Sequence, residues 1–518
     1  MGAGTDSRIP ECPPDFKRYP RERNRGLDAA PPDVPCSASL PMNEVDTSLS
    51  ALRRDAGPDL PVAREVASLV RSIGGRAWLV GGCVRDALLG RPCHDLDMEV
   101  YGVPADRLES ALAARWPLDR VGASFGVVKL RHRDIDIALP RRENRLGAGH
   151  RDFAVSSDPG LPPAEAAARR DFTVNAVMAD PLTFEILDPW NGVGDLRAGV
   201  LRHVSDHFAE DPLRVLRAMQ FLARMPFLSP APDLVAVCAT MTQDALPRER
   251  LAGEWEKLLL QGVEPSRGLA FLRACGWLRF YPELEALVDV PQDPVFHPEG
   301  DVWTHTLLAL DAAARMRDAA SRSREDGLAL SLAALCHDLG KPAATARGED
   351  GRLHAYDHEN LGVAPARAFV ARLWNQEWIV DLVAKLVEAH MRPIPLVLDG
   401  AGDRAYRRLA VQVGRLDLLA DLAECDLRAT TPPGGDPDAH PSLSIVRAFR
   451  ERCAALAVDR APPAPIVLGR DLIARGLEPG PSFGPILAAC YDAQLAGEIR
   501  DPATGAAFLE ALLARQGR

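Results

Sequence analysis

The sequence of 518 residues has no long hydrophobic segment. A helix that crosses a bilayer needs roughly 20 consecutive apolar residues, so we expect no membrane span. The N-terminal stretch MGAGTDSRIPECPPDFKRYP also lacks the apolar core of a secretory signal. The ten cysteines are scattered, without a C-x-x-C pair, which predicts reduced thiols in a cytoplasm rather than a disulfide scaffold.

Positive charge is in deficit, with a formal net charge of −11. Because nucleic acids are polyanions, an enzyme with this balance that acts on them needs a local basic groove. Composition alone therefore does not suggest an RNA enzyme. The 47% of hydrophobic and 26% of charged residues are typical of globular proteins, and the length predicts several domains.

The pattern of the chain divides it into five parts. Residues 1–41 hold eight prolines and almost no apolar periodicity, which predicts a disordered N-terminal extension. Strand and helix patterns alternate up to about residue 200, and helical periods dominate after it. We therefore expect an α+β fold with a mixed-sheet head followed by helical domains, and its parts are 1–41, 42–200, 201–288, 289–430 and 431–518.

The stretch LVGGCVRDALLG, residues 79–90, carries the first functional signal. A strand over 77–80 leads through two glycines into a helix over 84–89. Gly82 lets a phosphate approach the main chain closely, and Arg85 places a guanidinium one turn into the helix. Many strand-to-helix turns contain paired glycines, so this signal is weak alone.

Asp95 and Asp97 make the signal specific. They are separated by one residue in a strand predicted over 95–100, so both carboxylates face the same side of the sheet. Two acids at that spacing favour hard cations such as Mg²⁺. Asp136, in a later strand of alternating Asp and Ile, is the candidate third carboxylate. Asp134, two residues earlier, is the alternative because it would lie on the same face of the strand.

This order of motifs resembles the nucleotidyltransferase head of class II tRNA CCA-adding enzymes and bacterial poly(A) polymerases. The resemblance continues through RRDFTVNA (169–176), DPWNGVGD (188–195) and EDPLRVLR (210–217). It implies transfer of nucleotides from ATP and CTP to the 3′ acceptor end of tRNA, with Mg²⁺ held by Asp95 and Asp97. It further implies nucleotide binding by Gly82, Arg85, Arg170, Asp211, Arg214 and Arg217, with Asn175 as a candidate for a ribose hydroxyl.

Asp211 and Arg214 explain the choice of base. At i, i+3 on a predicted helix they lie side by side. Cytosine and adenine each offer an amine donor beside a ring-nitrogen acceptor, which a carboxylate and a guanidinium match. Guanine and uracil offer the reverse pattern, and the mismatch discriminates against them. A surface salt bridge is the commoner meaning of this spacing elsewhere.

The chain departs from the family pattern in two places. Alanines at 166–168 replace the usual acids, and Gln220 replaces the usual arginine; neither is a metal ligand, so we expect activity to survive. A segment rich in Gly, Arg and Ser between residues 140 and 169 is predicted to be a flexible loop. In CCA-adding relatives such a loop assists the switch from C to A, which favours full CCA addition over a partial activity.

A second constellation lies in HPEGDVWTHT (297–306) and LCHDLGKP (335–342), which resemble the HD phosphohydrolase superfamily. By its ligand order, His305, His337, Asp338 and Asp426 hold a divalent metal of unspecified identity from three helices. His354, His358 and His390 are additional candidates near the metal or phosphate. Lys341 is placed to meet a phosphate oxygen.

A CCA-adding head followed by such a domain resembles the multifunctional bacterial CCA proteins. The resemblance implies hydrolysis of terminal phosphates, including 2′,3′-cyclic phosphates and 2′-nucleotides. His390 is followed by Met391 where relatives often have Asp, which leaves the exact substrate open. The alternatives are a poly(A) polymerase or partial CC- or A-adding enzyme, an HD hydrolase with a non-catalytic RNA-binding head, and a tRNA-binding scaffold. The sequence predicts no oligomeric state.

Overall fold

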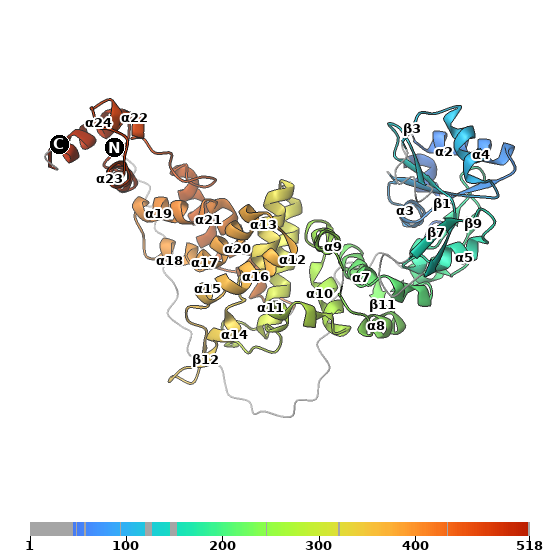
Figure 1. Cartoon of the computed structure of the whole chain (residues 1–518). Coiled ribbons are helices and arrows are strands. Elements are labelled where there is room, and N and C mark those ends of the chain that lie inside the picture. The colour runs from blue at the N-terminus through green and yellow to red at the C-terminus, as the bar shows by residue number, and fades with distance from the viewer. Residues whose placement is uncertain are drawn as a thin grey trace, which may run out of the picture. The chain divides into compact units, whose positions relative to one another are not determined.

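The computed structural model describes residues 45–515 apart from 48, 56–58, 94, 120–126, 146–152, 245, 320–321 and 433. The predicted N-terminal extension lies outside the described residues. Within them, the α+β organisation expected from the sequence is confirmed, with a mixed sheet first and helices after it (Figure 1).

Seven strands of the described residues form one mixed sheet in the order β3-β4-β5-β2-β1-β8-β9. Strand β2 is parallel to β5 and antiparallel to β1. The bounds are β1 Arg76–Val80, β2 Leu96–Tyr101, β3 Leu118–Asp119, β4 Val127–Leu130, β5 Ile135–Ala138, β8 Met178–Ala179 and β9 Ile186–Leu187.

The side chains of β2 point alternately to the two faces of the sheet. Leu96 and Met98 are buried in the core, whereas Asp97 points to the opposite face. Asp97 is in register with Asp136 of β5, so these two carboxylates lie on adjacent strands. The strand expected over 95–100 begins one residue later, and Asp95 precedes it.

The helices of the head cover this sheet. Helix α3 follows β1 directly, through Gly81 at φ 74°, a conformation that side-chain-bearing residues rarely adopt. In α2 the buried residues Ala63, Val66, Ala67 and Val70 repeat with helical spacing. The bounds are α1 Ser50–Asp55, α2 Asp59–Ser72, α3 Gly82–Leu88, α4 Ala105–Ala113, α5 Pro163–Ala168 and α6 Gly192–Ala198.

The loop predicted between residues 140 and 169 is in part a hairpin, which corrects that expectation. Strands β6 (Arg141–Arg145) and β7 (Phe153–Ser157) pair antiparallel, and α5 follows them. The glycines that suggested flexibility, Gly147 and Gly149, fall within residues 146–152, which lie outside the described residues. Composition was misleading because the flanking segments satisfy their backbone groups by pairing with each other.

The neck is helical, with one short parallel pair of strands. Helices α9 and α10 pack against α7, and α10 also contacts α12 of the next domain. The bounds are β10 Val200–Leu201, α7 Leu213–Arg224, β11 Ser229–Pro230, α8 Pro232–Ala239, α9 Arg248–Gln261, α10 Pro265–Ala274 and α11 Pro282–Glu285, with short 3₁₀ turns at Thr173–Asn175, Asp206–Glu210 and Trp277–Phe280.

Helix α13 is the centre of the next domain, because every residue from Gly327 to Cys336 is buried. It packs against α12, α17 and α20, drawn in yellow to orange in Figure 1. The bounds are α12 Val302–Ala319, α13 Arg324–Cys336, α14 Lys341–Ala344, β12 Ala346–Arg347, β13 Leu353–His354, α15 His358–Leu361, α16 Val363–Leu373, α17 Glu377–Ala389, α18 Pro393–Leu398, α19 Asp403–Val413 and α20 Leu416–Ala429.

The C-terminal region has two kinds of packing. Helix α21 contacts α20 and α18, whereas the segment from Val467 onward has a hydrophobic core of its own, which includes Leu472, Ile486 and Leu509. The bounds are a 3₁₀ turn at Pro437–Ala439, α21 Leu443–Ala455, α22 Gly469–Ile473, α23 Phe483–Ala496 and α24 Pro502–Arg515.

Candidate functional site

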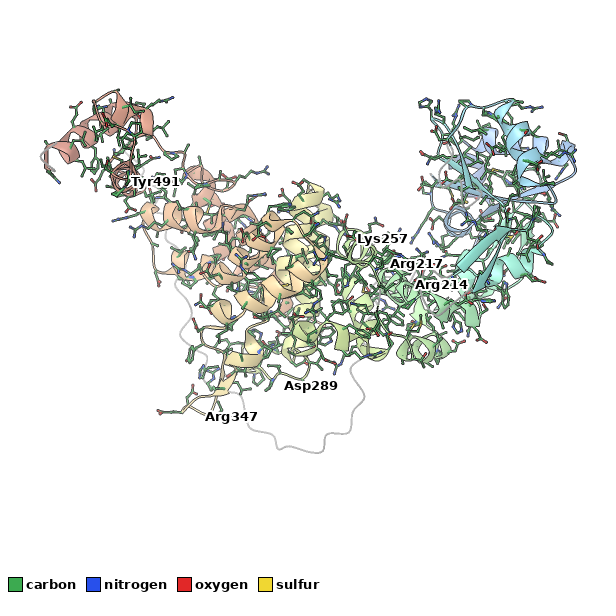
Figure 2. The ribbon with its side chains drawn as sticks, viewed as in Figure 1. Arg214, Arg217, Lys257, Asp289, Arg347 and Tyr491 are labelled. Atoms are coloured by element: carbon green, nitrogen blue, oxygen red, sulfur yellow. The ribbon has the colours of Figure 1, made fainter. Side chains whose placement is uncertain are left out.

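A cavity of about 800 Å³ opens between the sheet of the head and the helices of the neck, and we call it the head cavity. Nine basic side chains line it against five acidic ones, so it is a local basic groove despite the net charge of −11. Figure 2 marks three of the basic residues on α7 and α9. The charged lining residues are Arg85, Arg141, Arg169, Arg170, Arg214, Arg217, Arg224, Arg250, Lys257, Asp97, Glu99, Asp136, Asp171 and Asp211.

Asp97 and Asp136 form the acidic end of this cavity. Burial raises the pKa of Asp97, and the neighbouring charges of Asp136 and Asp95 raise it further. Oδ1 of Asp136 is buried without a hydrogen bond, and Lys129 Nζ lies 3.6 Å away from it. Crowded, under-satisfied carboxylate oxygens are the donor set that a hard divalent cation requires, so these residues fit Mg²⁺.

Asp95 and Asp134 are placed differently. Asp95 is exposed and does not line the cavity, although its charge acts on Asp97. Asp134 precedes β5, and its main-chain N–H donates to Asp59 at 3.2 Å. Of the two aspartates that the sequence left open, Asp136 is therefore the one beside Asp97.

Arg85 belongs to a buried network rather than standing free in the cavity. Its guanidinium donates to both carboxylate oxygens of Asp86 at 2.9 Å and to Asn175 Oδ1 at 2.8 Å. Asn175 in turn donates to Asp171, which also accepts from Arg217. Burial opposes ionisation of Asp171, but the Arg217 guanidinium outweighs it and holds the pKa of this carboxyl below its usual value. The network fixes these residues at the wall of the cavity.

Asp211 and Arg214 both line the cavity, but Asp211 is not in the helix. Helix α7 begins at Leu213, and the Asp211 carboxylate accepts the N–H of that residue at 3.1 Å, which corrects the expected i, i+3 helical pair. Pro212, as the N-cap residue, sets the helix start. In the described part of the chain, the ion pair of Asp211 is with Arg250 at 2.8 Å.

The Arg214 guanidinium is fixed by two main-chain carbonyls. It donates to the oxygens of His207 and Arg169, each at 2.5 Å. Five N–H donors belong to a guanidinium, so others remain for a ligand. Burial lowers the pKa of Arg214, which nonetheless stays charged because arginine titrates far above neutral pH.

Arg170 and the unusual Gln220 also line the cavity. Arg170 donates to Glu99 at 3.0 Å and to the carbonyl of Asn175 at 3.0 Å. Gln220 is buried and accepts from Arg224 at 3.1 Å, one helical turn later. Arg224 thus brings a guanidinium to the wall one helical turn from Gln220.

A second site lies in the following domain, and we call it the histidine–aspartate cluster. It consists of six buried or nearly buried side chains: His305, His337, Asp338, His358, His390 and Asp426. They come from α12, the end of α13, the start of α15, the end of α17 and α20. The three helices expected from the sequence therefore supply only part of the set.

The cluster contains two triplets whose ligand atoms lie within 4.8 Å of one another. One is His305, His337 and Asp426, with His305 Nε2 at 3.0 Å from Asp426 Oδ1. The other is Asp338, His358 and His390. Asp338 joins them, because its Oδ2 lies 3.3 Å from His337 Nε2 and its Oδ1 lies 3.4 Å from His358 Nε2.

Three histidines are held in the same tautomer by main-chain carbonyls three residues earlier. Nδ1 of His337, His358 and His390 lies 2.9, 2.7 and 2.6 Å from the respective carbonyl oxygen. Because a carbonyl only accepts, each Nδ1 carries the proton and each Nε2 presents its lone pair to the cluster.

These lone pairs face each other. Nε2 of His358 and His390 are 3.1 Å apart, and Nε2 of His305 and His337 are 3.2 Å apart. Burial, with the neighbouring His337 and His358, lowers the pKa of His390 to about 3, so this ring is neutral at pH 7. The Nε2 lone pairs of His358 and His390 repel at such a distance unless a cation lies between them, so the donor set fits divalent metal.

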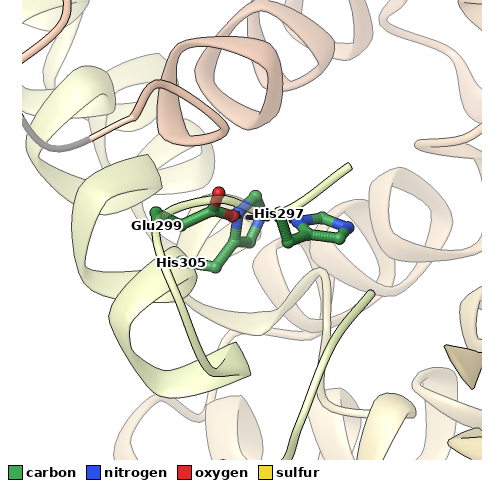
Figure 3. Close-up of side chains that lie close together, drawn as sticks. All are labelled: His297, Glu299 and His305. Carbon is green, nitrogen blue, oxygen red and sulfur yellow. Dashed lines mark hydrogen bonds and ion pairs between the residues drawn. The ribbon is translucent and has the colours of Figure 1, made fainter. Parts of the chain in front are cut away.

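Glu299 is a residue that the sequence reasoning missed. Its Oε1 accepts from Nδ1 of His305 at 2.7 Å and from Nδ1 of His297 at 2.9 Å (Figure 3). A carboxylate behind a ligating histidine orients the ring and makes its other nitrogen a better donor. The available signal was a glutamate inside the HPEGDVWTH motif itself.

Lys341 and His354 differ in their relation to the cluster. Lys341 is buried, with Nζ 2.7 Å from Asp338 Oδ2 and 2.7 Å from Gln292 Oε1. Together with the neighbouring His337, it holds the pKa of Asp338 well below its usual value against the opposing effect of burial. His354 lies outside the cluster, on β13, and pairs with Asp350 at 3.0 Å.

The two sites define a nucleotidyltransferase head joined to an HD-type metal domain. The family "Poly A polymerase head domain" matches residues 77–202, and the family "HD domain" matches residues 302–422. Both families are metal-dependent. No helix in the described part of the chain is long and apolar enough to cross a membrane.

Curated relatives make the assignment more specific. A "Multifunctional CCA protein" of Xanthomonas campestris pv. campestris (strain B100) is 37% identical over 81% of this chain and 98% of its own length. Another, from Laribacter hongkongensis (strain HLHK9), is 36% identical over 72% of this chain and 89% of its own. The chain belongs to the family of multifunctional CCA proteins.

Solved structures share the fold. The Bacillus stearothermophilus CCA-adding enzyme in complex with CTP aligns with 89% of this chain and 99% of its own, at a TM-score of 0.58 and 23% identity. The Thermotoga maritima CCA-adding enzyme complexed with tRNA aligns with 90% of this chain and 98% of its own, at a TM-score of 0.55 and 17% identity.

Proposed function

We propose that this protein adds the CCA end to tRNA from CTP and ATP, and that its histidine–aspartate cluster hydrolyses terminal phosphates of RNA or nucleotides. The observation that carries the first activity is the head cavity, where the carboxylates of Asp97 and Asp136 face a predominantly basic wall. The relatives named multifunctional CCA proteins support it over nearly their whole length.

In the proposed transfer, the RNA 3′ hydroxyl releases its proton to water, a bond forms between its oxygen and the α-phosphorus, and pyrophosphate leaves with the electron pair. Asp97 and Asp136, with Asp95 at the rim, would hold Mg²⁺, which supplies positive charge to the attacking and leaving oxygens. Basic residues of the wall bind the triphosphate. Arg85 and Arg217 contribute as parts of the fixed Asp171–Asn175 network.

Asp211 and Arg214 select the base in this proposal. The Arg214 plane is fixed by two carbonyls, and Asp211 is fixed by Arg250 and by the start of α7. A rigid donor beside a rigid acceptor matches the amine and ring nitrogen of C and A. A base with carbonyl and N–H reversed leaves both protein groups unpaired, which is costly in a buried site.

The cluster would hold one divalent ion in each triplet, with Asp338 between them. Such ions supply Lewis acidity and lower the pKa of water. In hydrolysis a water oxygen bonds to phosphorus, the bond to one ribose oxygen breaks, and that oxygen takes a proton. Lys341, beside Asp338, is placed to bind a phosphate oxygen.

The experiment that tests the proposal removes each site separately. We expect His337→Ala to abolish release of phosphate from 2′-AMP and opening of 2′,3′-cyclic AMP, with Mn²⁺, Ni²⁺ or Mg²⁺ supplied, and to leave CCA addition intact. Asp97→Ala should give the reverse result. A wild-type protein that adds CCA but cleaves neither compound with any of the three metals would refute the hydrolase.

A further inference from the structure

Exposed apolar side chains are concentrated, along the chain, near two histidines of the histidine–aspartate cluster and near His297, which shares Glu299 with His305. Ten large hydrophobic side chains are exposed among the described residues, and half of them lie within three residues of His297, His358 or His390 along the chain. These five are Val295, Phe296, Tyr356, Leu361 and Met391. Clustered apolar exposure beside a buried polar site marks a place where a ligand binds.

The two aromatic members are supported in the same way. The Phe296 ring lies 4.9 Å from the Arg352 guanidinium, which Asp293 holds at 2.8 Å. The Tyr356 ring stacks on the His354 imidazole at 5.0 Å and 8°, and Asp350 holds that imidazole at 3.0 Å.

Both rings remain open on their other side. Phe296 is 64% exposed and Tyr356 is 77% exposed, although each is backed by a planar group that a carboxylate anchors. An aromatic ring fixed on one face and bare on the other is ready to accept a planar partner without a large loss of side-chain entropy.

Sequence neighbours and hydrogen bonds connect these rings to the cluster. Phe296 precedes His297, which shares Glu299 with His305. Tyr356 lies two residues before His358, and Arg352 and His354 lie on or next to the β12–β13 hairpin, which Arg347 marks in Figure 2. We propose that Phe296 and Tyr356 stack the base of a nucleoside phosphate whose phosphate reaches Lys341 and the cluster.

A nucleobase is the occupant that fits, because its planar faces stack on aromatic rings while its phosphate needs the cationic side. The inference rests on the proposed hydrolase and adds the residues that recognise its substrate: Phe296 and Tyr356 bind the base, so the site selects nucleotides by more than their phosphate. If the site does not bind the base, it should hydrolyse phosphate esters without a base at the same kcat/KM as nucleotides.

The test compares 2′,3′-cyclic AMP with glycerol 1,2-cyclic phosphate, which has the same five-membered phosphate ring and no base. With the full-length Mn²⁺-loaded protein, we expect Phe296→Ala and Tyr356→Ala each to raise KM for 2′,3′-cyclic AMP about 5- to 150-fold, which corresponds to the range of base–aromatic stacking energies. The kcat should stay within about 2-fold, because the rings do not touch the reacting atoms. Kinetics on the glycerol compound should not change, and Tyr356→Phe should retain the wild-type KM.

Trp378→Ala is the matched control. Trp378 is also an exposed aromatic, at 44%, but it lies near the start of α17, about 18 Å along the helix from His390. Equal kcat/KM on both compounds in the wild type would overturn the proposed stacking of the base on Phe296 and Tyr356. Equal losses of kcat/KM on both compounds in Phe296→Ala and Tyr356→Ala would overturn it as well.

Equilibrium dialysis of 2′-AMP separates this inference from the hydrolase itself. If the wild type cleaves neither compound, the hydrolase fails, and 2′-AMP binding that weakens in Tyr356→Ala still supports the stacking of the base. Binding that is absent, or unchanged in Tyr356→Ala, overturns the stacking as well.

Discussion

At the scale of single residues, both sites depend on polar atoms held where they are poorly satisfied. Asp136 has a buried oxygen without a hydrogen bond, and the pKa of Asp97 is raised by burial and by its acidic neighbours. In the histidine–aspartate cluster, the Nε2 lone pairs of His358 and His390 face one another at 3.1 Å. Such arrangements cost stability without a cation, which is why they indicate metal chemistry.

The first prediction separates Asp136 from Asp134, two aspartates with the same spacing logic. We expect Asp136→Ala to lower nucleotide addition by at least about 10³-fold, because a metal-binding carboxylate is lost. Asp134→Ala should remain within about 2-fold of wild type, since Asp134 precedes β5 and does not line the head cavity. Single-turnover incorporation of labelled CTP measures both, and equal losses would contradict the assignment.

The second prediction concerns base selection. Asp211→Ala should admit G or U at a rate at least about 10-fold above wild type, because the acceptor that opposes a carbonyl is removed. Asp206→Ala is the control, because Asp206 is exposed in the neighbouring 3₁₀ turn and does not line the cavity. Sequencing of products made with each nucleotide alone provides the measurement. Unchanged selectivity with reduced thermal stability would identify Asp211 as a structural residue only.

The third prediction tests Glu299 as the group that orients His305. Glu299→Gln keeps an acceptor for Nδ1 but removes the charge, so Mn²⁺ affinity should fall about 10- to 100-fold. Asp301→Asn is the control in the same loop, because the Asp301 side chain caps α12 through Thr304 and does not touch the imidazoles of the cluster. Metal titration followed by calorimetry reads affinity without relying on activity. Equal affinities in both variants would show that Glu299 has no such role.

At the scale of elements, the sequence predicted strands and helices well where periodicity was strong. The strands at 77–80 and 135–138 were confirmed, as was the run of helices after the head. The start of α7 was wrong because Pro212 takes the N-cap position, and the 140–169 segment was wrong because its glycines lie between two pairing strands. Local propensity does not reveal such tertiary pairing.

The candidate site was predictable as far as its motifs reached. Asp97 with Asp136, and His337 with Asp338, could be predicted as pairs because spacing and order carry their chemistry, and each pair lies together in the structure. Glu299 and the two-triplet arrangement were not, because they depend on where five separate elements meet. The Arg85–Asn175 contact joins residues 90 positions apart, and a single sequence holds no signal for it.

The fourth prediction concerns the packing of α12 on α10. Asp311 accepts from Ser266 N at 2.9 Å and from its hydroxyl at 2.6 Å, and burial raises the pKa of this carboxyl to about 6. A pKa above the unfolded value means that the folded chain binds the extra proton. The protonated Asp311 therefore stabilises the folded chain fully below about pH 4, and this stabilisation is lost as the pH rises through 6.

Asp311→Asn should remove this dependence. The unfolding temperature of the Asp311→Asn variant, relative to that of wild type, should rise between pH 4 and pH 7. The corresponding gain in the free energy of unfolding is about 3 kcal/mol at most. Glu325→Gln, at an exposed position of α13, should show no such trend. Thermal unfolding across this pH range measures it, and parallel curves for Asp311→Asn and wild type would contradict the account.

At the scale of the whole molecule, positive charge is concentrated locally although the net charge is negative. A chain with net charge −11 has a basic surface in the head cavity, where we propose that the polyanionic substrate binds. The histidine–aspartate cluster uses a separate set of helices and shares no residue with that cavity. The account therefore expects two independent chemistries on one chain, one that builds an RNA end and one that removes phosphate from it.

The most direct test of the central claim uses tRNA that lacks its last three nucleotides. The purified protein is incubated with CTP, with ATP and with both, in Mg²⁺, and the product ends are sequenced. The account predicts CC with CTP alone, CCA with both nucleotides, none of either in Asp97→Ala, and wild-type products in His337→Ala. Homopolymeric A tails, an arrest at CC with both nucleotides present, or no addition would contradict it.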